Sequence, residues 1–165
     1  MLELYDLPDE HLLARYKEKY PELDVTALIC FLKLLRVASD VESSLNTFLT
    51  QFDISQRRFF ILILLTRRLE GWTPSELAKG TGVTNATMTG VLDTLVKDGL
   101  VERKTDPEDR RVKVVVITPK GEELMDKIFP QHYGRVARLM EDFDSRQRDE
   151  LLETLDKIQN SMGKM

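Results

Sequence analysis

The chain contains little of the chemistry on which most enzymes and metalloproteins depend. Its 165 residues include one cysteine, Cys30, and two histidines, His11 and His132. A single cysteine excludes an internal disulfide and fits a reducing compartment, so we expect a cytoplasmic protein. With so few nitrogen and sulfur ligands we expect no metal site. Since no motif surrounds a Ser or Cys nucleophile and no glycine loop is built to hold phosphate, we expect no cofactor and no enzymatic activity.

Long apolar runs are also missing. No stretch reaches the ~20 apolar residues that a membrane span requires. The N-terminal sequence MLELYDLPDEH is acidic, whereas a signal peptide begins with a basic and then an apolar region. We therefore expect no membrane partner. The length is that of one domain, and a chain of this size buries roughly 70% of its unfolded surface, enough for a core without disulfides.

Positive charge is in deficit overall, but the deficit is uneven. The net charge of −4 divides into −4 for residues 1–52, +3 for residues 53–120 and −3 for residues 121–165. Affinity for nucleic acid comes from local contacts to phosphates and not from the total charge of a protein. The central third is therefore the part of the chain that is suited to DNA.

Two short helices separated by a turn are predicted in this central third. Thr73 is placed to cap the first helix, with a proline after it and Glu76 completing a capping box. Gly80 and Gly82 should end this helix, because both tolerate the positive φ of a tight turn. Thr84 should cap the second helix.

The second helix has two different faces. Apolar side chains at helical spacing should face the core, namely Met88, Val91, Leu92, Leu95 and Val96. The first turns carry small or hydrogen-bonding residues, namely Thr84, Asn85, Ala86, Thr87 and Thr89. Such side chains suit a helix that enters the DNA major groove, because Asn can bond adenine, Thr can bond either base class and a methyl can touch thymine. The alternative is an ordinary amphipathic helix with a polar solvent face.

A two-stranded hairpin is predicted next, with strands at Leu100–Lys104 and Val112–Thr118. Pro107 between them favours a turn, and the tip carries the adjacent arginines Arg110 and Arg111. Arginine suits phosphate contacts and insertion into a narrow minor groove. A charged tip is usually only a soluble loop, but directly after a helix-turn-helix it favours a DNA-contacting wing.

A helix-turn-helix followed by this wing closely resembles the multiple-antibiotic-resistance regulator (MarR) family of bacterial transcription factors. The resemblance is carried by VTNATMTGVLDTLVKDGLVERKTDPEDRRVKVVVITPKG, with its L-x-x-L-x-x-x-G-L-V and D-P-x-D-x-R patterns. Asp106, Asp109 and Arg111 fall on the family's wing-loop positions. Many relatives have an arginine where this chain has Glu108, which implies a different contact at the tip.

The resemblance implies a mainly α fold with a small β-hairpin, in which a winged helix-turn-helix DNA-binding lobe joins a helical dimerisation region. One MarR-like domain would span residues 1–165, with dimerisation helices in 1–52 and 121–165 and the winged lobe in 53–120. The implied function is transcription regulation, with repression favoured, by a homodimer on a pseudo-palindromic operator in double-stranded DNA. A small aromatic or phenolic effector would release the DNA. The rival hypothesis is a helical protein-interaction module with the same fold that does not bind DNA.

The flanking regions give further helix predictions. Asp9 should cap a short N-terminal helix, and Asp24 a long one that reaches about Gln51. Phe59–Leu65 is apolar all round, which predicts a buried helix. Asp144 or Ser145 should cap the last helix.

Several single residues near these helices are candidates for special roles. We expect the arginines beside the buried helix to be solvated rather than phosphate-bound, namely Arg57, Arg58, Arg67 and Arg68. One branch of the resembled family senses organic hydroperoxides through a cysteine in its first long helix. Cys30 lies about one residue out of that register, so a buried and inert cysteine is favoured. Trp72 could either pack at a hinge or line an effector cavity.

Overall fold

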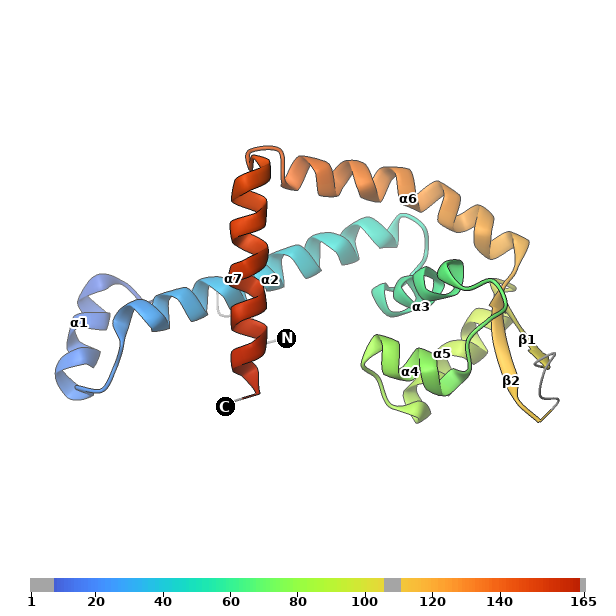
Figure 1. Ribbon diagram of the computed structural model, residues 1–165, viewed down its shortest axis with the longest axis horizontal. Coiled ribbons are helices and arrows are strands. Elements are labelled where there is room, and N and C mark those ends of the chain that lie inside the picture. Colours follow the sequence, from blue (N-terminus) through green and yellow to red (C-terminus); the bar gives the residue numbers. More distant parts are fainter. Residues whose placement is uncertain (1–7, 106–110, 164–165) are drawn as a thin grey trace.

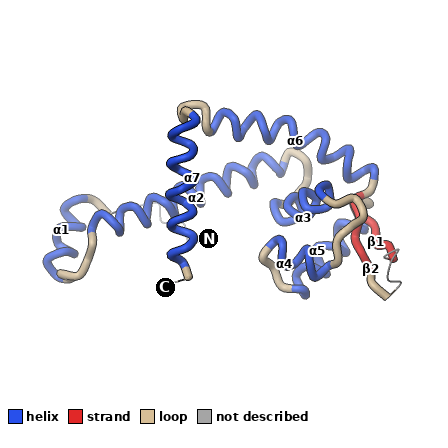
Figure 2. Tube along the Cα trace, viewed as in Figure 1, coloured by secondary structure: helices blue, strands red, loops and turns tan. Residues whose placement is uncertain are grey.

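The protein is mainly helical, with one two-stranded antiparallel hairpin, and this confirms the predicted fold class (Figures 1 and 2). The computed structural model describes residues 8–105 and 111–163. Its elements are α1 (Glu10–Lys19), α2 (Val25–Thr50), α3 (Gln56–Arg67), α4 (Pro74–Thr81), α5 (Asn85–Lys97), β1 (Val101–Thr105), β2 (Lys113–Ile117), α6 (Pro119–Leu139) and α7 (Ser145–Met162). The predicted turn residues Asp106, Pro107 and Glu108 lie outside the described residues, as do Asp109 and Arg110.

Each of these helices begins behind a polar cap. The capping side chains accept a backbone N–H from the first turn, and they belong to Asp9, Asp24, Ser55, Thr73, Thr84, Thr118 and Asp144. An N-cap satisfies one of the donors that a helix leaves without an internal partner, so the cap defines where the helix can start. The helix starts predicted at Asp9, Asp24, Thr73 and Thr84 are confirmed.

The predicted end of α4 is half right. Gly82 ends the helix with φ of 68°, in the left-handed region that glycine adopts without strain. Gly80 instead lies inside α4, so the prediction that it breaks the helix is wrong. A Cβ atom at Gly80 would stand 2.9 Å from Cδ1 of Leu64. The missing side chain therefore lets α4 pack closely on α3.

The core of the winged lobe is formed where α3 meets α4, α5, the hairpin and α6. Its fully buried side chains include Phe59, Ile61, Leu62, Leu65, Leu77, Met88, Leu92, Leu95, Met125 and Ile128. The prediction that Phe59–Leu65 is buried all round is wrong at Phe60, which is 40% exposed. Val96, predicted to face the core, is exposed as well. Within the protomer, the neighbouring elements therefore cover only part of these two side chains.

The hairpin is anchored to the lobe by a third extended segment. β1 pairs with β2 in a register that sets Val101 against Ile117. Trp72 exchanges two backbone hydrogen bonds with Val115 on the other side of β2, at 3.0 and 2.8 Å. Gly71 has φ of 105°, and a Cβ there would lie 2.8 Å from Cγ1 of Val116. Only glycine therefore fits at this crossing, which fixes the hairpin beside α5.

The remaining helices extend away from the lobe and leave apolar side chains uncovered. α2 runs from the lobe to α1 at the opposite end of the molecule, and α6 runs from the lobe to α7, which crosses in front of α2 in this view (Figure 1). Every residue of α7 is exposed. The exposed apolar side chains of α2, α6 and α7 include Ile29, Phe31, Leu35, Val136, Leu139, Leu151, Leu152, Leu155, Ile158 and Met162.

Cys30 lies on this uncovered part of α2. The thiol side chain is exposed, so the prediction of a buried cysteine is wrong for the single chain. The reason is that the N-terminal half of α2 has exposed neighbours on both sides of Cys30, namely Ile29 and Phe31.

Within the described residues, no helix is both long and apolar enough to cross a membrane.

Candidate nucleic-acid interface

Helix α5 is held firmly on its inner face. Met88, Leu92 and Leu95 are fully buried in the lobe core, as predicted. Thr84 caps the helix by accepting the backbone N–H of Thr87 at 3.2 Å. Because one face of α5 is packed and its start is capped, the backbone that presents the side chains of the other face is held in place.

The outer face of α5 carries most of the residues predicted to contact DNA. Thr84, Asn85, Ala86 and Thr89 are exposed, and they lie in the first turns of the helix. The Thr89 hydroxyl donates to the backbone oxygen of Asn85 at 3.0 Å. Thr87 is half-buried, and its hydroxyl lies 3.0 Å from that of Thr84. Thr87 therefore supports the cap and is less open than the other four.

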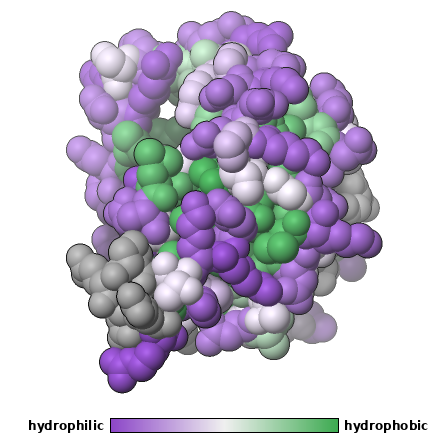
Figure 3. Space-filling view, turned by 90° about the vertical axis from the view of Figure 1, so that its right-hand side faces the viewer, coloured by the Kyte–Doolittle hydropathy of each residue, from purple (hydrophilic) through white to green (hydrophobic). Residues whose placement is uncertain are grey.

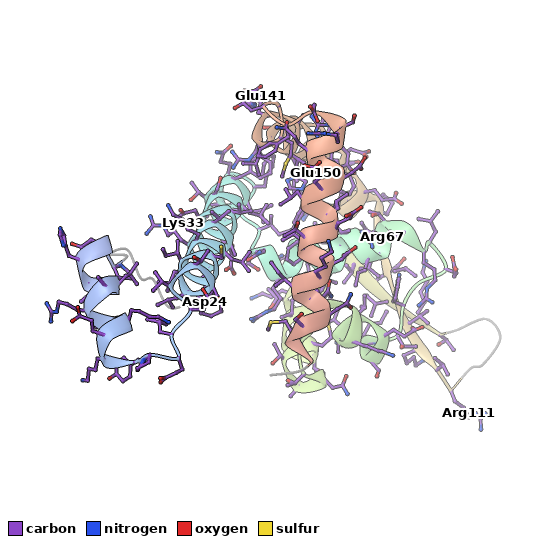
Figure 4. All side chains as sticks on the ribbon, turned by 60° about the vertical axis from the view of Figure 1, so that its left-hand side comes forward. Asp24, Lys33, Arg67, Arg111, Glu141 and Glu150 are labelled. Carbon is purple, nitrogen blue, oxygen red and sulfur yellow. The ribbon has the colours of Figure 1, made fainter. Side chains whose placement is uncertain are left out.

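The hairpin extends this surface with basic side chains. Arg111 stands at the far end of the hairpin and points away from the lobe (Figure 4). Arg103 and Lys113 are exposed on β1 and β2, although no sequence motif singles them out. Arg103 donates to the Asp93 carboxylate of α5 at 2.6 Å, and Lys113 donates to the Thr105 hydroxyl at 2.6 Å. Viewed from this side, the surface is largely hydrophilic, with apolar residues in separate patches (Figure 3).

Two of the four arginines expected to be solvated are structural instead. Arg58 forms an ion pair with Asp98 at the end of α5, and its side chain is only 16% exposed. Arg68 lies over the Trp72 ring, 4.0 Å from the centroid, and donates to the Gly71 backbone oxygen at 2.7 Å. Of the two roles considered for Trp72, hinge packing and lining of an effector cavity, these contacts favour packing at the junction between α3 and α4.

Glu76 connects Arg68 to the cap of α4. Its carboxylate accepts the backbone N–H and the hydroxyl of Thr73, each at 2.8 Å, and accepts from Arg68 at 2.9 Å. These hydrogen bonds lower the pKa of Glu76 below its ordinary value, and the bond from the Thr73 backbone N–H has the largest effect. The capping box predicted from the sequence is thus formed and carries a charge.

A cavity of about 630 Å³ lies between α2 and α6, beside the lobe. Its walls are largely apolar with a few polar groups, and are formed by Val37, Asp40, Val41, Ser44, Leu45, His132, Arg135, Val136, Arg138 and Leu139. Burial, and then the charge of Arg135, lower the pKa of His132. In the described ranges, no group of three or more His, Cys, Asp or Glu side chains could hold a metal ion.

Arg135 joins the two walls of this cavity. Its guanidinium donates to the backbone oxygen and hydroxyl of Ser44 at 3.1 and 2.6 Å, and lies 4.8 Å from the centre of the Phe48 ring. His132 stacks on the same ring and meets Phe59 of α3 edge-on. The cavity is therefore in direct contact with the side chains that join α2, α3 and α6.

Comparisons with known proteins agree with this architecture. The MarR family model matches residues 54–113. The HTH-type transcriptional repressor YetL of Bacillus subtilis (strain 168) is 30% identical over 155 residues, which cover 93% of each chain. The crystal structure of CouR from Rhodococcus jostii RHA1 bound to p-coumaroyl-CoA superposes with a TM-score of 0.69 at 29% identity, covering 79% of this chain and 90% of CouR. A MepR–DNA complex from S. aureus shares the fold with a TM-score of 0.71 at 22% identity, covering 78% and 94%.

Proposed function

The chain belongs to the MarR family of transcription regulators, and we propose that it represses transcription as a homodimer bound to a pseudo-palindromic operator. Membership of this family confirms the prediction of a regulator rather than an enzyme. The observation that carries the proposal is the outer face of α5, where small polar side chains stand exposed on a helix whose other face is locked in the core. The name of the repressor YetL supports repression over activation.

In this proposal each protomer places the start of α5 in a major groove. Thr84, Asn85, Ala86, Thr87 and Thr89 supply contacts to bases and nearby phosphates, with Thr87 acting mainly through the cap. Arg110 and Arg111 reach the minor groove or the phosphates beside it. The two grooves lie about 34–36 Å apart, one turn of the duplex, so the operator repeats its half-site with two-fold symmetry.

The exposed apolar side chains outside the lobe support homodimer formation. Exposed apolar patches of this extent mark interaction surfaces. A two-fold dimer would cover α7 and the first half of α2 with the same elements of a second copy. We assign residues 1–52 and 121–165 to this dimerisation region and residues 53–120 to the DNA-binding lobe, within one domain.

The experiment that tests this function replaces Asn85 with alanine. Loss of a bidentate contact should cost about 1–3 kcal/mol of binding free energy at one base pair of each half-site and leave other positions unaffected. The measurement is a set of dissociation constants for operators that carry each single base-pair change. A uniform loss over all sequences would contradict direct reading of a base by Asn85.

We further propose that a small aromatic or phenolic ligand binds in the cavity between α2 and α6 and thereby causes release of the DNA. The p-coumaroyl-CoA bound to CouR supports this ligand class. Apolar walls suit a ring, and Arg135 and Arg138 suit an attached anionic group. Since the cavity contacts the residues that join the lobe to α2 and α6, an occupant can favour one placement of the lobe over another, which is what release requires.

Ligand binding can be tested with p-coumarate, p-coumaroyl-CoA and salicylate. At least one of them should raise the thermal midpoint and weaken operator binding. Val41→Trp, which fills the cavity, should abolish both effects, while Ser43→Trp on another face of α2 should keep them. Release that survives Val41→Trp would place the effector elsewhere.

A further inference from the structure

Asp98 occupies a position that helix electrostatics disfavour. It is the C-cap of α5, where the carbonyl groups of the helix end already concentrate negative charge. Lys97 before it has the sign expected there, and Asp98 has the opposite sign. The carboxylate must therefore be held by contacts outside the helix.

Those contacts come from two other elements. The Asp98 carboxylate pairs with the Arg58 guanidinium of α3, and Lys120 at the start of α6 donates to the Asp98 backbone oxygen at 2.7 Å. Beside them, the Thr118 hydroxyl donates to the Gly99 backbone oxygen at 2.7 Å. The last turn of α5 is thus tied to both α3 and α6.

Arg58 is well placed for support and badly placed for contact with DNA. Its side chain is only 16% exposed, and among the described residues its Nε atom is buried without a hydrogen-bond partner. Asp98 lies at the opposite end of α5 from Asn85. In the proposed complex, the first turns of α5 face the duplex and Asp98 does not. The Asp98 side chain is 41% exposed, so the pair is only partly buried. Removal of Asp98 would leave the mostly buried Arg58 guanidinium without this partner, which costs more than the loss of a pair on the open surface.

The two tied elements also lead out of the lobe. α3 follows α2 after a short turn in which Asp53 has φ of 53°, a left-handed conformation that is uncommon for residues other than glycine. α6 runs from Pro119 away from the lobe to the turn that leads into α7 (Figure 1). The end of α5 is therefore fixed to both helices through which the dimerisation region joins the lobe.

We propose that Arg58 and Asp98 are positioning residues, which set the tilt of α5 on α3 and α6 so that the DNA-reading helix moves with the dimerisation region as one body. Neither side chain touches DNA. The proposal rests on the proposed operator binding and adds to it a pair that controls how α5 is aimed.

The test compares Asp98→Asn, Arg58→Met and the double variant with the parent protein. Removing a negative charge from the DNA-binding lobe would strengthen binding if charge alone mattered. Positioning predicts the reverse, a loss of operator affinity of up to about tenfold in each single variant, as expected when one partner of a partly buried charged pair is removed. The double variant should bind the operator no more weakly than the single variant of lower affinity, because both substitutions break the same interaction.

Three further readouts separate positioning from other roles. Affinity for non-specific DNA should fall much less than affinity for the operator, because the phosphate contacts of the hairpin do not depend on the aim of α5. The slope of log affinity against log salt should also stay unchanged in Arg58→Met, whereas loss of a phosphate contact would reduce it by about 0.9. Asp142→Asn, which makes the same charge change in the turn before α7, should bind the operator like the parent.

All affinities are measured well below the thermal midpoint of each variant, with Arg58→Lys and Asp98→Glu as conservative replacements that should recover part of the loss. Unchanged or stronger operator binding by Asp98→Asn, or a reduced salt slope in Arg58→Met, would overturn the proposal. Failure of the parent protein to select any operator would instead overturn the proposed function on which it rests.

Discussion

At the scale of single residues, the small size of Asn85, Ala86 and Thr89 decides what α5 can approach. These exposed side chains are short, so the helix axis can come close to a groove and its backbone can share in the contacts. The sequence alone identified them, because helical periodicity separates them from the buried Met88 and Leu92. Their contacts with bases stay a prediction.

Arg111 gives the residue-scale prediction for the hairpin. Arg111→Ala should weaken binding on all DNA sequences by a similar factor and reduce the salt slope by about 0.9, since a phosphate contact is lost without loss of base reading. The measurement is operator affinity from low to near-physiological salt. Arg146→Ala on α7 is the control. Arg146 is exposed, pairs with Glu150 on the same helix and lies far from the hairpin. A salt slope equal to that of the parent would remove Arg111 from the phosphate contacts.

At the scale of elements, helix starts could be predicted from the sequence and long-range partners could not. Thr73 with Glu76, and Thr84 alone, act on their own helices within three residues, so local sequence contains the whole interaction. The role of Gly80 depends on Leu64 of another helix, and the burial of Arg58 depends on Asp98, forty residues away. Such pairings become visible only when the elements are packed together.

The cap of α4 leads to a prediction about pH. Because the folded-state pKa of Glu76 is lowered, its charge stabilises the fold above the unfolded-state pKa, near 4.5, and this contribution is lost as pH falls through the folded-state value. Glu76→Gln keeps an acceptor for Thr73 but removes the charge. The variant should therefore have a lower thermal midpoint at neutral pH, and the difference from the parent should shrink below pH 4.5. Thermal unfolding followed from pH 3 to 7 measures this difference.

A difference in midpoint that stays constant over that pH range would show that the Glu76 charge contributes nothing through the cap. Glu70→Gln, in the exposed turn before α4, is the matched control and should follow the parent across the range.

At the scale of the whole molecule, the exposed apolar side chains of α7 are the feature that one chain cannot account for. Leu151, Leu155 and Ile158 recur on one face of a helix that is exposed throughout. The sequence predicted helices at both ends of the chain, and the family resemblance implied that these helices form a dimerisation region. The sequence could not show that their apolar side chains stay uncovered within the protomer, which also explains why Cys30 was wrongly predicted to be buried.

This surface yields a prediction about assembly. The parent protein should sediment as a dimer, and Leu155→Glu should shift it toward monomer, because a charge would be buried without a partner in the interface. Asn160→Glu adds the same charge on the opposite face of α7 and should remain dimeric. Sedimentation velocity over a range of protein concentrations distinguishes these outcomes. A parent protein that stays monomeric at micromolar concentrations would contradict the proposed homodimer.

Selection from a random duplex pool at near-physiological salt tests whether a dimer of this chain reads a two-fold symmetric DNA site. The parent protein should enrich one pseudo-palindromic sequence whose half-site centres lie about one helical turn apart. Arg111→Ala, selected in parallel, should give weaker enrichment of the same sequence. A correctly folded dimer that enriches no sequence, after bound small molecules have been removed, would contradict the account and favour a protein-interaction module with the same fold.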